Sequence, residues 1–414
     1  MSFLLTLAFK NLSRHKKRTI FTTIGISVGI ALLIWMDGML RWADNESKRN
    51  LIRYEFGNFV LSKVNFKLDR DNFPLDKLMD FSAVKQIINK AEKEDLFCSP
   101  RTGFKVVLNN KRGFGLFYLV FAVDPVRYAK TLYVAKDIVK GKWLSEESMG
   151  IVISKNAAKD LDVKIGDTIT IETKTKYGSF QSVSVTVEGI FDADDPSVNR
   201  NQAFVSYKFS DTFFQTESSA SEIVFRSVNE KDEPFLSKMK DFINSIEVKD
   251  LVFSTWQELG ADFIVLSKTK RAGTKIMIFF LFIITAIGII NTMLMAVFER
   301  IPELAMMRAL GMKDNFIIFL FLLEATGIGF LGSTLGLFMG FFLNLWGVTK
   351  GLDFTGMVKD MDFGYRTGTV FYSEWNPDTM LLAFFFGIFC SVIVSILPAK
   401  KAVDITITDA LHYQ

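Results

Sequence analysis

The stretch IMIFFLFIITAIGIINTMLMAVF, Ile276–Phe298, has 23 consecutive residues without a charge. A helix needs roughly 20 such residues to cross a bilayer, whereas apolar runs in a soluble core are more typically about 10 to 14 residues long. Thr19–Met36 and Thr379–Ala399 are further uncharged runs, and residues 315–349 form a fourth that only Glu324 interrupts. These four runs predict four transmembrane helices. Because 23% of the 414 residues are nevertheless charged, part of the chain is expected to lie in water.

The flanking charges predict the orientation of the helices. Five basic residues and no acidic one precede the first run, namely Lys10, Arg14, Lys16, Lys17 and Arg18, and by the positive-inside rule this end stays in the cytoplasm of a bacterial cell, below its inner membrane. The predicted order is a basic cytoplasmic arm (1–18), a first helix (19–40), a large extracytoplasmic domain (41–270), a second helix (271–298), a short cytoplasmic helix (299–314), a third helix with an interfacial start (315–349), a periplasmic loop (350–378), a fourth helix (379–399) and a cytoplasmic tail (400–414). A cleaved signal peptide is the alternative for the first run, but no A-x-A cleavage pattern follows it.

Small residues recur every four positions in the predicted membrane helices. The series are Gly332, Gly336 and Gly340; Ala383, Gly387, Ser391, Ser395 and Ala399; and the single pair Gly25 and Gly29. Small side chains at this spacing let helix backbones approach closely in lipid. The stripes predict a compact bundle or a dimer interface. For the single pair, the abundance of glycine in membrane helices is an equally good explanation.

The polar region between the first two helices reads as a folded α+β domain in two lobes. Alternating runs such as DTITIET and VSVTVEGIF predict strands, and LDKLMDFSAVKQIINKAEKED and KDEPFLSKMKDFINSIEV have the apolar spacing of helices. The turn-rich segment KTKYGSFQS, residues 174–182, is expected at the tip of a hairpin. The expected fold class is therefore a membrane protein of four transmembrane helices with a large extracytoplasmic domain inserted between the first and the second.

The residue inventory argues against an enzyme. The two histidines, His15 and His412, are both predicted to be cytoplasmic, so no Ser-His-Asp or Cys-His arrangement forms in the outer domain. The acidic cluster DADD, residues 192–195, lacks the spacing of an EF-hand loop and is read as a solvated turn. No G-x-x-x-x-G-K-[ST] motif occurs in the sequence, so energy from ATP must come from a partner. A net charge of only +4 gives no reason to expect a nucleic-acid partner.

The loop ERIPELAMMRALGM, Glu299–Met312, predicts a short helix. Pro302 suits the first helical turn and Gly311 the position just past the end. Such a helix is too short to be stable alone, so the membrane surface, its own transmembrane helices or another protein must support it. Glu303 and Arg308 lie five positions apart and do not face each other, which leaves both charges available to partners or to water. Glu324 is expected either at the interface or facing the bundle, in both cases as a structural residue.

The chain resembles the FtsX-like permease family, the membrane subunits of type VII ABC transporters, over nearly its whole length. VFERIPELAMMRALGMKDNFIIFLFLLEATGIGFLGSTLGLFMG is similar to the most specific signature of that family. The segments AVDPVRYAKTLYVAKDIVKGKWLSEESMGIVISKNAAKDLDVKIGDTITI and VTVEGIFDADDPSVNRNQAFVSYKFSDTFF resemble the extracytoplasmic domain of MacB-like proteins, and especially of lipoprotein-releasing permeases of the LolC/LolE kind.

The resemblance implies a role for the short helix. It would be the coupling helix that docks on a dimer of a LolD-like cytoplasmic ATPase, which itself binds ATP and Mg. The matching positions are Glu299, Arg300, Glu303, Leu304, Met307, Arg308, Ala309, Leu310 and Gly311. Closure of the ATPases would push on this helix, and stiff helices would carry the movement to the outer domain, a mechanism called mechanotransmission. The chain itself is then a non-catalytic subunit that binds no cofactor or metal.

The function that the resemblance favours is lipoprotein release from the inner membrane to a periplasmic LolA-like carrier, with a second permease subunit, identical or related, completing the complex. MacB-type efflux and FtsX-type activation of a cell-wall hydrolase are the alternatives. Trp35, Met36, Met39, Leu40 and Trp42 are predicted to form an apolar site where lipid or substrate enters, or an interfacial aromatic belt. Lys176, Tyr177, Gly178 and Phe180 are predicted to face the carrier.

Overall fold

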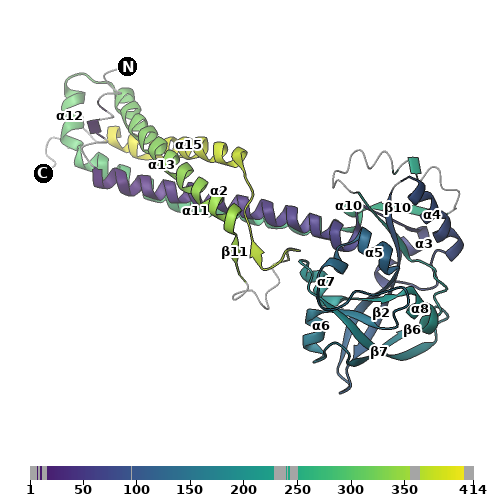
Figure 1. Cartoon of the computed structure of the whole chain (residues 1–414). Helices are drawn as coiled ribbons and strands as arrows, with labels where there is room; N and C mark the ends of the chain where they lie inside the picture. The colour runs from purple at the N-terminus through teal and green to yellow at the C-terminus, as the bar shows by residue number, and fades with distance from the viewer. Residues whose placement is uncertain are drawn as a thin grey trace. The chain divides into compact units, whose positions relative to one another are not determined.

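The computed structural model describes residues 16–94, 96–227, 250–354 and 364–404, together with residues 7, 10, 11, 239, 241 and 242. The chain divides into two compact units (Figure 1). The membrane unit comprises Met1–Asp44, Ser267–Met361 and Thr369–Gln414, and the β-rich unit comprises Asn45–Leu266 and Asp362–Gly368. Most of the helix predicted within residues 231–248, part of the basic arm and most of the predicted cytoplasmic tail lie outside the described residues.

Four long helices contain the apolar runs. They are α2 (Lys16–Asn50), α11 (Ala261–Glu299), α13 (Asp314–Lys350) and α15 (Pro377–Asp404). Each is long and apolar enough to cross a membrane. Every helix extends beyond its uncharged run, because that run marks only the thickness of the hydrocarbon core and the helical backbone continues into water. Between α11 and α13 lies the short helix α12 (Ile301–Ala309).

The glycine stripe of α13 packs against α2. A Cβ atom built on Gly332 would lie 2.8 Å from Cβ of Ile26, and one on Gly336 would lie 2.8 Å from Cβ of Ile30. A Cβ atom on Gly340 would lie 2.8 Å from Cδ1 of Ile34. Glycine and isoleucine both recur every four residues, so two matching stripes meet along the two helices.

The small-residue stripe of α15 packs against α13 in the same way. A Cβ atom on Gly387 would lie 2.4 Å from Oγ of Ser333, and Ser391 donates a hydrogen bond of 2.8 Å to the carbonyl of Ala325. Ser395 is also buried, and its hydroxyl donates to Val392 within α15. The sequence stripes therefore mark the face on which α2, α13 and α15 meet.

The pair in the first helix behaves differently. Gly25 is exposed, and a Cβ atom placed there meets no atom within 4 Å in the part of the chain that the structure describes. Gly29 lines a small cavity of about 50 Å³ together with Phe282, Phe386 and other residues of α11 and α15. The prediction that Gly25 packs against another helix is thus not met within this unit, because this face of α2 has no described neighbour at that height.

The β-rich unit is built on one large sheet. Its strands are β1 (Phe59–Lys63), β2 (Phe97–Asn109), β3 (Gly115–Val123), β4 (Ile138–Gly141), β5 (Ile151–Ser154), β6 (Thr168–Lys174), β7 (Phe180–Phe191), β8 (Gln202–Ser206), β9 (Glu222–Arg226) and β10 (Leu251–Thr255). In the described residues their order is β10-β1-β9-β2-β3-β8-β5-β7-β4, and β6 pairs with both β2 and β7. The sheet is continuous through the region for which the sequence predicts two lobes.

Short helices connect and cover these strands. They are α3 (Val64–Lys67), α4 (Phe81–Lys93), α5 (Pro125–Thr131), α6 (Lys155–Asp160), α7 (Pro196–Asn201), α8 (Tyr207–Phe214) and α10 (Trp256–Leu259). Five of them begin at a side chain that accepts a backbone N–H, namely Asp124, Ser154, Asp195, Ser206 and Thr255. These caps satisfy amide groups that a helix N-terminus leaves unpaired, so short polar sequences fix where each helix starts.

A fully buried ion pair lies in the core of the β-rich unit. Glu222 of β9 accepts hydrogen bonds from Arg101 of β2 at 2.6 Å and from Arg70 at 2.5 Å. The guanidinium of Arg101 also lies over the ring of Phe121, 4.6 Å from its centroid. Burial by itself would raise the pKa of the Glu222 carboxyl, but the charges of Arg70 and Arg101 and their hydrogen bonds outweigh it and lower the pKa to about 2.

The acidic cluster 192–195 is only partly a solvated turn. Asp195 is fully buried, caps α7 by accepting the N–H of Ser197 at 2.9 Å, and accepts a hydrogen bond from Arg366 at 2.8 Å. Arg366 also forms an ion pair with Glu55. The prediction of a solvated turn is wrong for Asp195, because Arg366, which compensates its charge, lies 171 positions further along the chain.

Candidate functional site

The short helix α12 is the candidate site because it is the feature for which sequence analysis predicts a partner. It begins after Arg300, whose backbone turns the chain out of α11, with Pro302 in its first turn. Gly311, the second residue after the helix, has a φ of +95°, which favours glycine over residues with a side chain. Pro302 and Gly311 predict a helix over residues 302–310, and in the structure it begins and ends one residue earlier.

One face of α12 is buried in the membrane unit. Ile301, Leu304 and Ala305 are buried, and Leu304 packs in a cluster with Ile317 and Phe321 of α13. The sequence leaves three possible supports for this short helix: the membrane surface, the chain's own transmembrane helices or another protein. In the structure, a transmembrane helix of the same chain, α13, supports it. A single turn of buried apolar residues does not hold a short helix in one orientation, so its charged contacts are important.

At the start of α12, Arg300 forms a buried ion pair with Glu324. Nη1 of Arg300 donates to Oε1 of Glu324 at 2.9 Å, and Nδ2 of Asn11 donates to the same oxygen at 2.5 Å. The side chains of Arg300 and Glu324 are only 6% and 3% exposed. Glu324 thus faces the helix bundle, one of the two positions left open by the sequence, and a cation compensates its charge there.

At the end of α12, Arg308 forms an ion pair of 3.0 Å with Asp314, the first residue of α13. Glu299 and Glu303 also interact with other residues of the chain. Arg308 is therefore engaged within the chain, and a role of Glu303 or Arg308 at a partner stays a prediction. The spacing of charges along one helix says nothing of contacts with another helix.

The opposite face of α12 is exposed and apolar. Pro302, Met306, Ala309 and Leu310 are exposed, with Met306 at 57% and Leu310 at 88%. At 100° per residue these four positions fall on one side of the helix. Among the predicted coupling residues, Arg300 and Leu304 are buried, Met307 is half-buried, and Ala309, Leu310 and Gly311 are exposed. Sequence analysis missed Pro302 and Met306, although their helical spacing to Leu310 was a usable signal.

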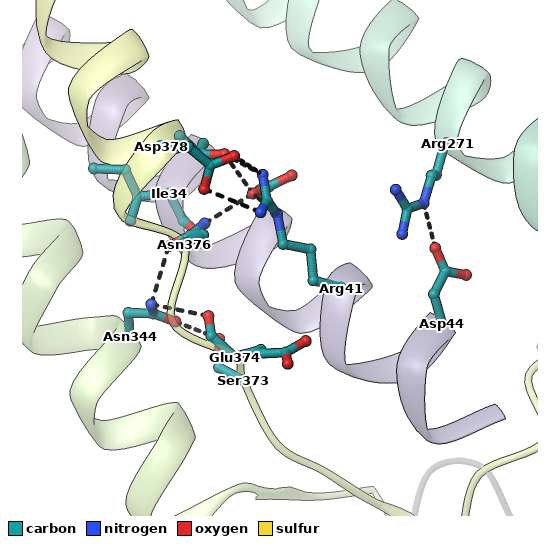
Figure 2. A network of polar contacts seen from close by, with 11 residues as sticks. Ile34, Arg41, Asp44, Arg271, Asn344, Ser373, Glu374, Asn376 and Asp378 are labelled. Carbon is teal, nitrogen blue, oxygen red and sulfur yellow. Dashed lines mark hydrogen bonds and ion pairs between the residues drawn. The ribbon is translucent and has the colours of Figure 1, made fainter. Parts of the chain in front are cut away.

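A second polar cluster joins α2, α13 and the start of α15, and Figure 2 shows its side chains pointing toward one another. Nδ2 of Asn376 donates to the carbonyl of Ile34 and to Asp37, both at 2.9 Å. Asn344 of α13 donates to Oδ1 of Asn376 at 3.1 Å, and the hydroxyl of Ser373 donates to Asn344. Asn344 and Asn376 are fully buried, so this cluster joins three elements by hydrogen bonds of buried amides.

Ion pairs flank this cluster along α2. Arg41 binds Asp378 at 2.6 Å, and Asp44 accepts from Arg271 on α11 (Figure 2). Asp44 also accepts at 2.6 Å from Ser267 of the same helix. Sequence analysis did not single out these residues, because their partners lie more than 220 positions away in the chain.

The residues predicted to receive lipid or substrate are half-buried. Trp35, Met36, Met39, Leu40 and Trp42 all have intermediate exposure. The Trp42 ring packs edge-on against Tyr372, with 5.5 Å between ring centroids. It also packs at a tilt against Phe371 at 5.8 Å, next to the small sheet of β11 (Leu352–Asp353) and β12 (Val370–Phe371). Trp42 is therefore packed within the chain.

The segment predicted to face a carrier is a hairpin turn between β6 and β7, which pair antiparallel. Lys176 and Tyr177 both donate to Glu217 at 2.9 Å, and Gly178 has a φ of +83° at the turn. Phe180 is 81% exposed with Lys174 over its ring. The geometry leaves Phe180 as the most exposed apolar group of the four predicted residues.

Comparison with known families identifies the chain. The profile described as "MacB-like periplasmic core domain" matches residues 19–235, more than half of the chain. The profile described as "FtsX-like permease C-terminal" matches residues 275–407, which include α12 and its two ion pairs. The chain belongs to the FtsX-like, MacB-type family of ABC transporter permeases.

The relatives of the permease have several functions. It is 23% identical over 352 residues to an uncharacterized ABC transporter permease of Methanocaldococcus jannaschii, covering 82% of this chain and 83% of that one. It is 22% identical to the macrolide export ATP-binding/permease protein MacB of Haemophilus ducreyi, with 98% of this chain covering 55% of that one. It is 23% identical to the lipoprotein-releasing system transmembrane protein LolE of Haemophilus influenzae, with 62% of this chain covering 63% of that one.

These near-equal identities establish the permease family and do not separate macrolide export from lipoprotein release. The architecture is settled at a coarser level: four candidate membrane helices with a β-rich domain between the first and the second. A permease subunit of this family is normally the non-catalytic membrane part of the transporter.

Proposed function

We propose that this permease is the membrane subunit of a lipoprotein-releasing ABC transporter in the bacterial inner membrane, with α12 and both chain ends in the cytoplasm and the β-rich domain in the periplasm. The exposed apolar face of α12 carries the proposal, because the helix is anchored at both ends and still presents Met306 and Leu310 to solvent. An ATPase of the LolD kind, with ATP and Mg bound, would cover this face.

Two observations support an ATP-binding partner for α12. The MacB relative is named as an ATP-binding/permease protein, and 98% of this chain covers 55% of it. These 414 residues contain no P-loop motif, so a nucleotide would bind outside them. A hydrophobic face of about two helical turns bordered by charge is a suitable centre for a protein interface, since such centres are apolar with a polar rim.

Lipoprotein release provides a physical need for that coupling. Each buried CH₂ of an acyl chain stabilises membrane attachment by about 0.8 kcal/mol, so a multiply acylated protein does not leave the bilayer at a useful rate. In this proposal a second permease subunit completes the path, the apolar groups around Trp35 and Met39 receive the acyl chains, and the β6–β7 hairpin with Phe180 meets a LolA-like carrier.

Co-purification tests the docking face. The full chain, solubilised with an ABC ATPase co-expressed from the same genome, should retain that ATPase. The double variant Met306→Asp/Leu310→Asp should lower the recovered ATPase by at least about tenfold, as expected for loss of an interface centre. The matched control Phe180→Asp also places a charge at an exposed apolar position, and it should retain the ATPase. Equal recovery by both variants would refute docking through α12.

Depletion of the permease separates lipoprotein release from export. Fractionation of depleted cells should show lipoproteins retained in the inner membrane. A normal lipoprotein distribution, combined with lost resistance to a macrolide, would instead support the export function named for the MacB relative.

A further inference from the structure

The two ion pairs of α12 both end on α13. Arg300, at the start of α12, binds Glu324 in the third turn of α13, whereas Arg308, at the end of α12, binds Asp314 at the start of α13. The start of α12 is thus paired with the later of the two α13 carboxylates, Glu324, and the end of α12 is paired with the earlier one, Asp314. Only an antiparallel arrangement satisfies both pairs.

The lengths agree with this arrangement. At 1.5 Å per residue, Arg300 and Arg308 are separated by roughly 12 Å along α12, and Asp314 and Glu324 by roughly 15 Å along α13. Between the two ion pairs, Leu304 packs with Ile317 and Phe321. Backbone hydrogen bonds close the turn, from Gly311 to Arg308 at 2.9 Å and from Met312 to Met307 at 3.0 Å. The helices α12 and α13 therefore form a hairpin tied at both ends.

The connection to α11 is of another kind. The chain runs directly from α11 into α12, but the helix is interrupted at Arg300, whose φ of −116° and ψ of 12° are not helical. The apolar stretch of α11 is also less enclosed, with 12% of it buried against 50% for α13. A movement of α12 is therefore expected to displace α13, to which two ion pairs connect it, more directly than α11, to which only a bent backbone connects it.

The buried pair of Arg300 and Glu324 is better explained by fixing the register of α12 on α13 than by adding to the stability of the fold. Taking Arg300 and Glu324 out of water costs more than an apolar pair of similar size would. Among the described residues, Nη2 of Arg300 has no hydrogen-bond acceptor, so the compensation is incomplete. Ion pairs of this kind fix one register between two helices, because any other register leaves a charge buried without its partner.

On the basis of the proposed docking of an ATPase on α12, we infer that Glu324 is a positioning residue, which through Arg300 makes α12 and α13 move as one body. A push on Met306 and Leu310 then moves α13. Because Gly332, Gly336 and Gly340 hold α13 against α2, and Asn344 ties it to Asn376, the movement reaches the far end of the membrane unit.

A distance measurement tests this coupling in the full chain bound to its ATPase. Spin labels at Lys350→Cys on α13 and Lys275→Cys on α11 report the separation of the two helices before and after ATP with vanadate. Both positions are exposed. The two native thiols, Cys98 and Cys390, are buried, and burial raises the pKa of Cys98 to about 12, so the labels react with the introduced cysteines.

The wild-type separation should shift when nucleotide and vanadate are added. Arg300→Glu and Glu324→Arg, each alone, should lose the shift, and the double exchange Arg300→Glu/Glu324→Arg should restore it. Lys400→Glu, which reverses an exposed charge at the end of α15, is the control and should shift like the wild type. Rescue by the exchange distinguishes positioning from a general loss of structure.

Each other outcome also decides the question. An unchanged shift in both single variants, or no shift in the wild type with ATPase bound, overturns the positioning role. If the single variants do not fold, Glu324→Gln, which keeps the size and an acceptor oxygen, should still reduce the shift, and a full shift in that variant overturns the inference. Failure of the wild-type chain to retain any ATPase refutes the proposed function itself, which is a separate result.

Discussion

Glu222 in the β-rich unit and Glu324 in the membrane unit are both buried carboxylates, and they are compensated to different extents. Glu222 receives two guanidinium groups, from Arg101 and Arg70. Glu324 receives one, from Arg300, and the amide of Asn11. The comparison shows that the β-rich unit compensates its buried carboxylate with two cations, whereas the membrane unit compensates Glu324 with one and holds α13 against α2 by close backbone contact.

The largest effect is expected from Glu222→Ala. It leaves Arg101, which is fully buried, without its counter-charge, and the loss of one partner of a buried pair lowers the free energy of unfolding by about 3–5 kcal/mol. Hydrogen exchange of the β2 and β9 amides in the full chain measures this loss. Glu172→Ala, at an exposed position of β6, is the control, and equal protection in the two variants would contradict the comparison.

The second-largest effect is expected in the pH dependence of the stability of the β-rich unit. The folded pKa of Glu222 is about 2, below its ordinary 4.5. A lowered folded pKa gives stability that is complete above pH 4.5 and disappears as the pH falls toward 2. This contribution amounts to roughly 3 kcal/mol at most. Unfolding measured from pH 6 to 2 should show this loss in the wild type, and Glu222→Gln should lack that component. Parallel curves for the two proteins would argue against the assignment.

In the membrane unit, the close contact between α2 and α13 predicts that even one added methyl group at this contact lowers the stability. Gly336→Ala places a Cβ atom 2.8 Å from Cβ of Ile30 and from the carbonyl of Ser27, and such overpacking lowers stability by about 1–3 kcal/mol. Gly25→Ala meets no described atom within 4 Å and should be neutral or slightly stabilising, since alanine favours helix. The thermal midpoint in detergent checks both, and identical midpoints would show that the α2–α13 contact is loose.

The smallest effect is expected where charge is exposed. Arg112 and Asp162 form a pair of 3.5 Å with side chains 81% and 75% exposed. A double-mutant cycle with Arg112→Ala and Asp162→Ala should give a coupling energy below about 1 kcal/mol. A larger coupling energy would mean that burial is not the reason why the Glu222 ion pair contributes more to stability than an exposed pair.

Much of the membrane unit could be predicted from the sequence. The four long helices follow from apolar run length, which depends only on neighbouring residues. Gly332, Gly336 and Gly340 were recognised because a four-residue spacing puts them on one face wherever the helix lies. Gly25 has the same spacing to Gly29, yet a Cβ atom on it would meet no described atom within 4 Å. The sequence does not say which face of a helix has a neighbour.

The candidate site divides in the same way. Pro302 and Gly311 marked a short helix from local backbone preferences, and its need for support followed from its length. The partners of Arg300 and Arg308 were not predictable, since the spacing of charges along one helix does not reveal a carboxylate on the next. The roles of the hairpin residues Lys176 to Phe180 and of Trp35 to Trp42 remain predictions that experiments on the permease must test.

Four membrane-spanning helices, a large polar domain after the first of them, and a short helix between the second and third can all be predicted from the amino-acid sequence alone. These are properties of local composition and periodicity. Only the tertiary structure decided that Glu324 binds Arg300 and Asn11, that Asp195 is buried against Arg366, and that Met306 and Leu310 form the exposed face of α12. Each of these depends on residues that are far apart in the chain or on which side of a helix is covered, and packing alone brings them together.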